Sequence, residues 1–329
     1  MLRIRIGTQF EFVLTARPDI SGPYRRKIEI QDSFRQGGGF MARQEAVRRG
    51  YLNERFRLFY LKDTATGRVD WHYHNFHKIL FFLGGHASYV IEGKRYALEP
   101  GDMVLVPQGC IHRPEVQSDL PYERYVLYLS QSFLDGASSD ETDLAACFRM
   151  AERRYQFVLR PDREGDLFKL LGELRQAQDS PQFGRDLMCR AWLTQILVTL
   201  TRKLEDHQLL YVSSVCDERI VSVLRYLNLH VGEPLSIDDL ARQFYISKYY
   251  LMRRFKAATG YSIHGYISEK RLILARTRIA AGEPLKQVSE SCGFRDYSAF
   301  ARAYKQRFGI SPSTPLPPQL AQSPDREAD

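Results

Sequence analysis

The feature that most constrains the fold is a helical pattern that occurs twice in the last third of the chain, about 49 residues apart. In the first copy, Ser236 can cap a short helix, and Ser247 can cap a second helix that ends at Gly260. In the second copy, a turn at Gly293 separates a short helix from one that Asp296 can cap. Two short helices joined by a tight turn form a helix-turn-helix. The sequence therefore predicts two such units in succession.

The second helix of each unit has one apolar face and one polar face. Leu251 and Phe255, like Phe300 and Tyr304, stand four residues apart and should face the core. A spacer helix over about 263–281 joins the two units. The opposite faces could enter a major groove of DNA. They carry Lys248, Tyr249, Met252, Arg253 and Lys256 in the first unit, and Tyr297, Ser298, Ala301, Arg302 and Lys305 in the second.

The basic charge of the chain is concentrated in this same region. The whole chain has a net charge of +8, and the segment from Asp217 to Pro312 holds 16 Lys and Arg against 9 Asp and Glu. A basic excess confined to a predicted pair of helix-turn-helix units favours an anionic partner such as nucleic acid.

The segment GFRDYSAFARAYKQRFGISP resembles the signature of the AraC/XylS family of bacterial transcription regulators. Leu285, Val288 and a spacer helix with Arg271 and Ala275 precede it, and the resemblance spans roughly 100 residues with both units in order. The sequence departs from the family pattern at Ser289, at Tyr304 and in its SPSTPL end, which lacks the usual aromatic-Arg pair. These departures concern the packing of the last turn.

The resemblance implies that helices 247–258 and 296–307 enter successive major grooves, about 34 Å apart. Arg253 and Arg302 would each bond O6 and N7 of one guanine, whereas Lys256 and Lys305 would neutralise phosphates. The family's base-reading positions match Tyr249, Met252 and Arg253 in the first helix, with Lys248 on the same face, and Tyr297, Ser298, Ala301 and Arg302 in the second.

Short alternating or apolar runs separated by turn residues fill the region from about Arg57 to Ser130. Such regularly spaced strands are typical of a small β-barrel or sandwich. After Gly136 the pattern becomes helical, with leucine-rich stripes over 167–174 and 193–204. The second stripe could serve dimerisation or pack within the chain, and the sequence leaves both open.

Three histidines lie in the stretch WHYHNFHK, residues 71–78. Because strand side chains alternate, His72 and His74 should share one face. The segment 101–112 has the G-x5-P-x-G-x2-H spacing of the second motif of the cupin superfamily, so His112 would face both across a cupin-like barrel. We expect His77 and His86 at the surface or in turns.

In cupin enzymes, three or four residues separate the second histidine from a carboxylate that completes the metal site, and at these positions this chain has Lys78 and Ile79. An ammonium beside a divalent cation is repelled, so we expect no metal and no cofactor. His72, His74, Lys78 and His112 would instead supply donors to a small polar effector such as a sugar or carboxylate. Three histidines alone can hold zinc, so the alternative is a cupin metalloenzyme joined to a DNA-binding module. A ligand-independent barrel that only dimerises is another.

The expected class is α+β with two domains: a cupin-like barrel with flanking helices, then an all-α double helix-turn-helix. We expect a cytoplasmic transcription regulator, more an activator than a repressor and not an enzyme, that binds promoter DNA as a homodimer and contacts RNA polymerase. Five scattered cysteines favour reduced thiols, and no apolar run is long enough to cross a bilayer. The expected boundaries are 41–136 for the effector-sensing barrel, 137–205 for the dimerisation or packing helices, 206–217 for the linker, 218–312 for DNA binding and 313–329 for a disordered tail.

Residues 1–40 are expected to be a non-native or disordered extension. Codons for Gln36 to Gly38 can contain a bacterial ribosome-binding sequence just before Met41, which suggests a misplaced start codon upstream. The alternative is a flexible basic arm.

Overall fold

The computed structural model describes residues 2–5, 11–14, 52, 54–64, 69–117 and 120–314. The chain divides into two units, Met1–Val47 and Arg48–Asp329. In the first, β1 (Leu2–Arg5) pairs antiparallel with β2 (Glu11–Leu14). The rest of the extension expected over 1–40, and residues 315–329 of the expected tail, lie outside the described residues.

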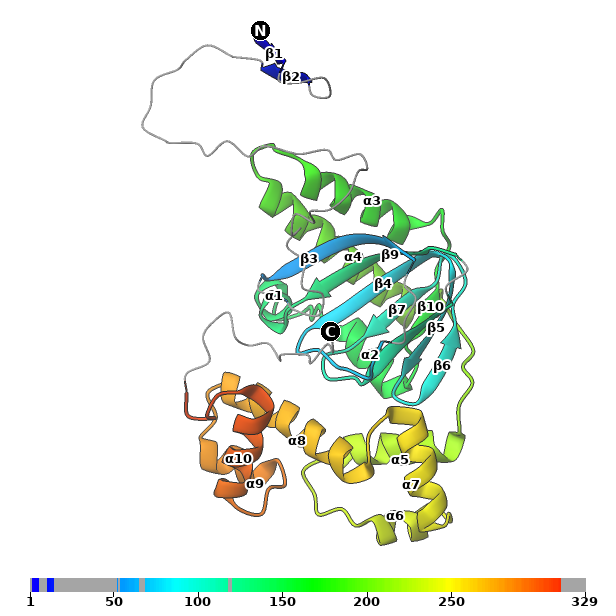
Figure 1. The fold of residues 1–329 in the computed structure, drawn as a ribbon, viewed down its shortest axis with the longest axis vertical. Coiled ribbons are helices and arrows are strands. Elements are labelled where there is room, and N and C mark those ends of the chain that lie inside the picture. The colour runs from blue at the N-terminus through cyan, green and yellow to red at the C-terminus, as the bar shows by residue number, and fades with distance from the viewer. Residues whose placement is uncertain are drawn as a thin grey trace. The chain divides into compact units, whose positions relative to one another are not determined.

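Antiparallel strands form the first half of the second unit (Figure 1). The larger sheet has six strands in the order β11-β10-β7-β4-β9-β3, and the smaller has three in the order β6-β5-β8. The strands are β3 (Phe56–Asp63), β4 (His77–Gly84), β5 (His86–Ile91), β6 (Lys94–Ala97), β7 (Met103–Val106), β8 (His112–Gln117), β9 (Tyr122–Leu129), β10 (Val158–Arg160) and β11 (Leu210–Tyr211).

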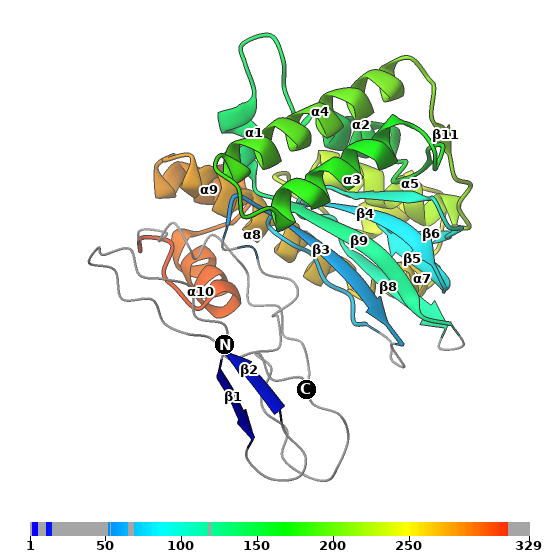
Figure 2. The ribbon, with the colours of Figure 1, turned by 90° about the horizontal axis from the view of Figure 1, so that it is seen from above.

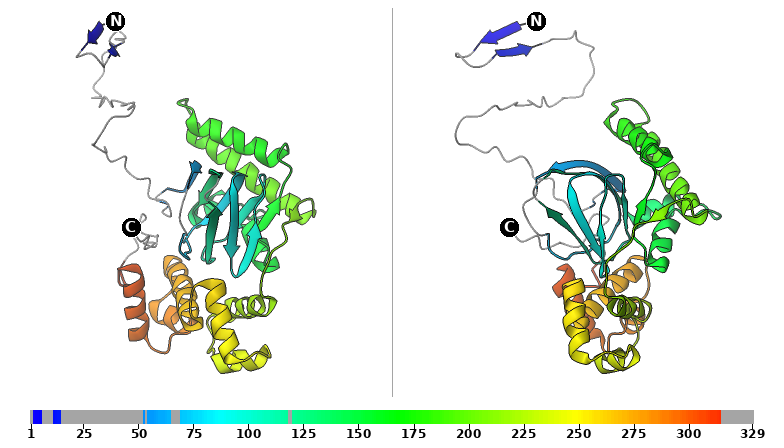
Figure 3. Two further views of the ribbon diagram at one scale, coloured as in Figure 1. Left: turned by 45° about the vertical axis from the view of Figure 1, so that its right-hand side comes forward. Right: turned by 90° about the vertical axis from the view of Figure 1, so that its right-hand side faces the viewer.

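The expected barrel is revised in one respect. The described strands pair into two sheets and do not close into one continuous ring, although they curve around a shared interior (Figure 3). The cupin-like character of this domain, with antiparallel strands and flanking helices, agrees with the sequence prediction.

Helices cover one face of the larger sheet, as Figure 2 shows for α3 and α4. Strand β4 is buried on both faces because it lies between this helical layer and the sheet interior. The Phe81 ring, for example, meets the Phe168 ring of α3 edge to face at 5.6 Å. The helices of this half are α1 (Gln131–Ala137), α2 (Ala146–Arg154), α3 (Asp166–Asp179) and α4 (Arg185–Glu205).

The leucine-rich stripe of α4 packs within the chain. Its five members are at most 2% exposed, and α4 packs along α3. The stripe therefore contributes to the core of this domain, and a dimer would have to use other residues. The stripe consists of Leu193, Ile196, Leu197, Leu200 and Leu204.

Six helices form the second half: α5 (Glu218–Leu229), α6 (Ile237–Gln243), α7 (Lys248–Thr259), α8 (Ile263–Ala280), α9 (Leu285–Ser291) and α10 (Tyr297–Phe308). The predicted caps are confirmed. Ser236, Ser247 and Asp296 each accept a hydrogen bond from the backbone N–H three residues later. Gly260 and Gly309 end α7 and α10 in the left-handed conformation that glycine favours. These two helices, the second of each unit and the ones expected to enter the major grooves, are called the recognition helices below.

Helix α8 links the two helix-turn-helix units and organises both. The Arg271 guanidinium donates to the backbone carbonyls of Val231 and Glu233 before α6 and of Gly293 after α9. One side chain thus ties the loop before α6 and the turn after α9 to the spacer helix. None of the described helices has the length and apolar character needed to cross a bilayer.

Candidate functional site

The first recognition helix, α7, exposes the face that the sequence predicted. Leu251 and Phe255 are fully buried, whereas Tyr249 is 75% and Met252 48% exposed. The Arg253 guanidinium lies 5.9 Å from the centre of the Tyr249 ring, so these two side chains lie beside each other on the exposed face. Lys256 is also exposed.

Lys248, at the first position of α7, bonds within the protein. Its ammonium lies 2.9 Å from the Asp238 carboxylate of α6. The two side chains are 52% and 65% exposed, so water screens the pair and its net free energy is small. A DNA phosphate or base edge could compete for this ammonium at little cost.

The second recognition helix, α10, repeats the arrangement. Phe300 and Tyr304 are fully buried, and Tyr297 is 41% exposed at the start of the helix. Ser298, Arg302 and Lys305 are exposed, and Ala301 is half-buried. The predicted polar face therefore forms in both units.

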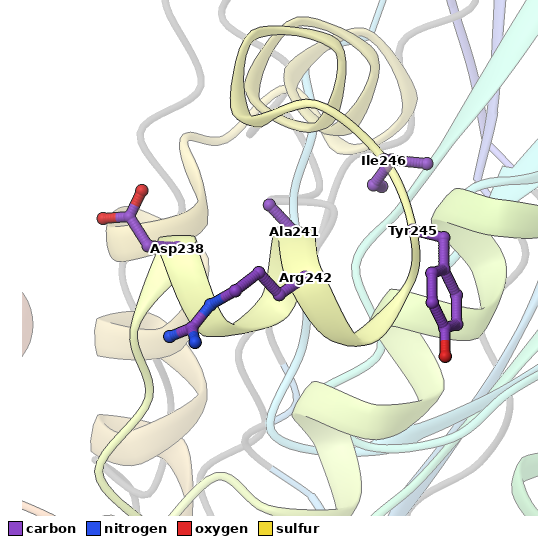
Figure 4. Close-up of a pocket in the computed structure, with 5 residues that line it drawn as sticks. All are labelled: Asp238, Ala241, Arg242, Tyr245 and Ile246. Atoms are coloured by element: carbon purple, nitrogen blue, oxygen red, sulfur yellow. The ribbon is translucent and has the colours of Figure 1, made fainter.

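A shallow hollow beside the first unit is formed by α6 and the turn that follows it (Figure 4). It is lined by Asp238, Ala241, Arg242, Tyr245 and Ile246. The Tyr245 ring projects from the turn and is 93% exposed, while Arg242 bonds Asp239 on the exposed side of α6. Because Asp238, Arg242 and Tyr245 are all exposed, the hollow belongs to the outer surface of the helix-turn-helix.

The three histidines of the predicted pocket come together inside the sheet domain. The ring centres of His72, His74 and His112 are 4.4 to 5.0 Å apart, and their nearest nitrogens all lie within 4.8 Å of one another. His72 and His112 do not face each other from opposite walls as expected. They pair as backbone neighbours, exchanging N–H to carbonyl hydrogen bonds of 3.1 and 2.9 Å.

Hydrogen bonds determine which nitrogen carries the proton in two of the rings. Nδ1 of His72 lies 2.8 Å from the carbonyl of Asp70, and Nδ1 of His112 lies 2.9 Å from that of Cys110. A carbonyl oxygen can only accept, so each Nδ1 is the protonated nitrogen. In the neutral rings Nε2 is then an acceptor. The expectation that all the pocket histidines supply donors is revised.

Burial favours the neutral form of His74 and His112. Desolvation, together with the charge of Lys78, lowers the pKa of His74 well below its ordinary value. Desolvation also lowers the pKa of His112, with further contributions from His72 and Lys78. At neutral pH these imidazoles are therefore uncharged.

Lys78 places a positive charge beside these histidines. It is 8% exposed, and its ammonium donates to the Tyr89 hydroxyl at 2.9 Å. Tyr89 in turn stacks on the ring of His112, with ring centres 5.8 Å apart. The structure thus brings together all four residues that the sequence singled out.

His77 does not lie at the surface or in a turn. It is 7% exposed within β4, where Nδ1 accepts from the Gln108 backbone N–H and Nε2 lies 2.9 Å from the Gln131 side chain. Its parity in the strand directs it to the helical side of the sheet, against Phe148 of α2. His86 is exposed at the start of β5, as expected.

The sequence did not reveal that the pocket lies directly behind a contact with the recognition helices. Between His72 and His74, the Tyr73 hydroxyl donates to the Glu269 carboxylate of α8 at 2.7 Å. The Arg307 guanidinium of α10 bonds the same carboxylate at 2.8 Å and lies over the Tyr73 ring. On the other side of His72, the Trp71 indole packs against Gly260, where α7 ends.

A second contact of this kind centres on Glu92, in the turn between β5 and β6. Its carboxylate is 1% exposed and lies 2.8 Å from the ammonium of Lys270 in α8. It also accepts from Tyr266, from Asn228 and from the backbone N–H of Ile111. No sequence motif marks these residues, because they are far apart in the chain and only the fold brings them together.

Comparison with known proteins supports a ligand-binding domain followed by a helix-turn-helix domain. The AraC-like ligand binding domain family matches residues 55–197, and a helix-turn-helix domain family matches residues 240–315. A probable transcriptional regulator, LumQ of Photobacterium leiognathi, is 24% identical over 254 residues, which cover 76% of this chain and 93% of LumQ. The transcriptional activator RhaS of Escherichia fergusonii is 26% identical over 75% of this chain and 87% of RhaS.

The helix-turn-helix region has a shorter relative. The regulatory protein SoxS of Escherichia coli K12 is 30% identical over 95 residues, which cover 29% of this chain and 89% of SoxS. The relatives named here are transcriptional regulators and not enzymes. With a ligand-binding domain followed by two helix-turn-helix units, the chain belongs to the AraC/XylS family of DNA-binding transcription regulators.

Proposed function

We propose that this regulator is an activator whose DNA-binding helices respond to a small polar effector bound among His72, His74, Lys78 and His112. The observation that carries the proposal is the alternation of side chains at residues 71–74. His72 and His74 belong to the histidine cluster, and Trp71 and Tyr73 contact the helical domain. An effector that moves this segment changes both contacts at once.

The two contacts lie at equivalent places on the recognition helices. Trp71 packs at Gly260, which ends α7, and Tyr73 bonds with Arg307 in the last turn of α10 through Glu269. The relative orientation of α7 and α10 decides whether both can enter successive grooves. A displacement of one short segment would therefore be transmitted to both helices.

The Glu92 contact supports the same route, starting from His112. Ile91 pairs directly with His112 across β5 and β8, and Glu92 follows Ile91. Lys270 bonds both the Glu92 carboxylate and the Gly109 carbonyl, three residues before His112. Each of the three histidines thus lies within three residues of a residue that bonds to or packs against the helical domain.

For DNA recognition we propose base contacts from the exposed faces of α7 and α10. Arg253 and Arg302 would each read a guanine, since a guanidinium bonds O6 and N7 together. Lys256 and Lys305 would contact phosphates and add affinity without sequence preference. The other proposed base contacts are Lys248, Tyr249, Met252, Tyr297, Ser298 and Ala301.

We further propose that the protein acts as a homodimer in the cytoplasm and contacts RNA polymerase, with sensor, packing, linker and DNA-binding segments over 41–136, 137–205, 206–217 and 218–312. RhaS, a relative named as an activator, supports activation. For the dimer, the residues before and at the start of α4 offer an apolar surface, since Phe183, Leu187 and Met188 are each at least 48% exposed.

The proposal is tested by first selecting fragments of the source genome with the purified full-length protein at about 150 mM salt, where nonspecific phosphate binding is suppressed. The affinity of Tyr73→Phe for a recovered fragment is then compared with wild type. We expect a changed affinity, because the variant loses only the hydroxyl that bonds Glu269.

Tyr60→Phe is the matched control, because Tyr60 also bonds a glutamate, Glu123, but is 46% exposed on β3. Its affinity should equal that of wild type. If the two variants bind the fragment equally well, Tyr73 does not transmit the state of the pocket to the DNA-binding helices.

A further inference from the structure

The three pocket histidines present metal-ligating nitrogens to a common point. Their ring centres form a nearly equilateral triangle with sides of 4.4, 5.0 and 5.0 Å. The candidate ligand atoms lie within 4.8 Å of one another, two of the rings are buried, and no carboxylate belongs to the cluster.

We propose that His72, His74 and His112 bind a divalent transition-metal ion of the zinc class, and that this ion is the polar effector. Since it names the effector, the inference rests on the proposed function for its regulatory meaning. The metal site itself stands on the geometry of the three rings.

The hydrogen bonds of the rings favour a cation over an anion. The Asp70 and Cys110 carbonyls hold the Nδ1 protons of His72 and His112, so both Nε2 atoms present a lone pair. Such a bond from the non-ligating nitrogen to a carbonyl is the usual support of a metal-bound histidine. Nε2 of His112 is fully buried and has no hydrogen-bond partner among the described residues. A bound ion would satisfy it.

Aromatic neighbours hold the rings of His74 and His112 in place. The His74 ring stacks on Phe76 with ring centres 4.6 Å apart and planes within 10°. The His112 ring is stacked on Tyr89. Rings fixed in this way lose little conformational entropy on binding, which favours affinity.

Binding requires a small contraction of the site. In a tetrahedral zinc site with Zn–N bonds of about 2.0–2.1 Å, ligand nitrogens lie about 3.3 Å apart, whereas the widest separation here reaches 4.8 Å. The backbone of this segment is already tied to the one that carries His112, because His72 exchanges two hydrogen bonds with His112 and the His74 carbonyl accepts from the Gly109 N–H. The contraction would therefore combine rotation of the imidazole rings with a small shift of residues 72–74, and Tyr73 would move with them relative to Glu269.

Lys78 determines what completes the coordination sphere. Its ammonium acts on both His74 and His112 and would repel a bare divalent cation. An anion as fourth ligand, hydroxide or a small carboxylate, would compensate for this repulsion. The variant Lys78→Met should therefore bind the metal more tightly than wild type.

The experiment uses full-length protein freed of metal with a chelator and then dialysed against Zn²⁺ and, separately, Co²⁺. We expect one ion per chain and at least a tenfold weaker affinity for His74→Gln and His112→Gln. His86→Gln, which alters an exposed histidine on β5, should bind like wild type. Thermal melts of the metal-free variants verify that each is folded.

The visible spectrum of the Co²⁺ form identifies the ligands. Histidine ligands give d–d bands without sulfur charge transfer, whereas a site built from the cysteines would show that transfer. Thiolate bands, unchanged affinity in both folded histidine variants, or no stoichiometric binding would each overturn the inference.

DNA affinity measured with and without Zn²⁺ separates the inference from the proposed function. A stoichiometric ion held by the three histidines, with DNA affinity that changes at least threefold on its removal, supports both. The same ion with unchanged DNA affinity upholds the metal site and overturns its role as effector, while the Tyr73→Phe comparison still tests the coupling of the domains.

Discussion

The ammonium of Lys270 lies 2.8 Å from the carboxylate of Glu92, and this ion pair joins helix α8 to the turn between β5 and β6. Burial lowers the pKa of Lys270, but the adjacent Glu92 more than compensates and leaves it raised. Lys270 is therefore charged at neutral pH, and it meets the Glu92 carboxylate in a nearly solvent-free contact between the two domains.

We predict that Lys270→Met lowers the free energy of unfolding by about 3–5 kcal/mol, because it leaves a buried carboxylate without its cation. The double variant Glu92→Gln/Lys270→Met should recover part of this loss. Urea denaturation followed by tryptophan fluorescence measures both. Lys248→Met, which removes an exposed ion pair, should cost less than about 1 kcal/mol. If Lys270→Met lowers the free energy of unfolding no more than Lys248→Met does, the Glu92–Lys270 ion pair does not stabilise the protein as predicted.

A comparison of two glycines tests the contact between Trp71 and α7. Gly260 and Gly309 end equivalent helices with φ of +77° and +74°, so alanine strains both backbones by about 1–2 kcal/mol. At Gly260 the added methyl group would also collide with the Trp71 indole, whereas at Gly309 it meets open space. We expect Gly260→Ala to be less stable than Gly309→Ala by about 1–3 kcal/mol in the same denaturation assay.

Rescue by a second change makes this test specific. Gly260→Ala combined with Trp71→Ala should lose less stability than the sum of the single variants, because the collision is gone. Strict additivity would show that Trp71 and Gly260 do not pack together in solution.

Two basic residues should affect DNA binding differently. Arg302→Ala should cost about 1–3 kcal/mol on the selected site and relax the preference at one base pair, since it removes a base contact. Lys256→Ala should weaken binding to all sequences alike and reduce the salt dependence, as expected for a phosphate contact. Equal losses for Arg302→Ala on specific and random DNA would remove it from the base-reading residues.

His77 should make the protein sensitive to mild acid. Burial lowers the pKa of His77 to about 4, despite the hydrogen bond to Gln131 that raises it. The unfolded chain, with an ordinary pKa near 6.5, binds the proton first. Stability is therefore full above about pH 6.5 and falls as the pH drops toward 4, by about 3 kcal/mol from this residue. The Arg149 and Asp135 side chains also act on this ring, in opposite directions.

His77→Gln should flatten this part of the profile. Unfolding free energies measured at pH 7 and pH 4.5 give the comparison, and the difference between the two pH values should shrink in the variant. An identical difference in wild type and variant would assign the acid sensitivity to other groups.

Leu187→Glu tests the proposed dimer surface. A charge placed among exposed apolar residues at the start of α4 should shift the protein toward the monomer in sedimentation velocity experiments. Leu229→Glu, at an 81% exposed position at the end of α5, should leave the association unchanged. Identical sedimentation of wild type and Leu187→Glu across the concentration range would exclude this surface.

The local sequence alone determined where the helices of the second domain begin and end and which of their faces are buried. It also determined that His72 and His74 lie on one side of their segment. Capping residues act on N–H groups three residues away, and apolar spacing fixes which face of a short helix is buried, so both helix-turn-helix units could be predicted with their exposed residues. Strand alternation likewise predicted that His72 and His74 point one way and Tyr73 the other.

Tertiary structure alone decided what these residues meet. Whether the α4 stripe packs against α3 or a second chain, and whether β4 has one buried face or two, depends on contacts between distant segments. The same holds for Glu92 and Lys270, which are 178 residues apart and whose charges become important only when folding excludes water around them. The connection between the histidine pocket and the recognition helices therefore arises from the packing of the two domains and could not be predicted from any motif.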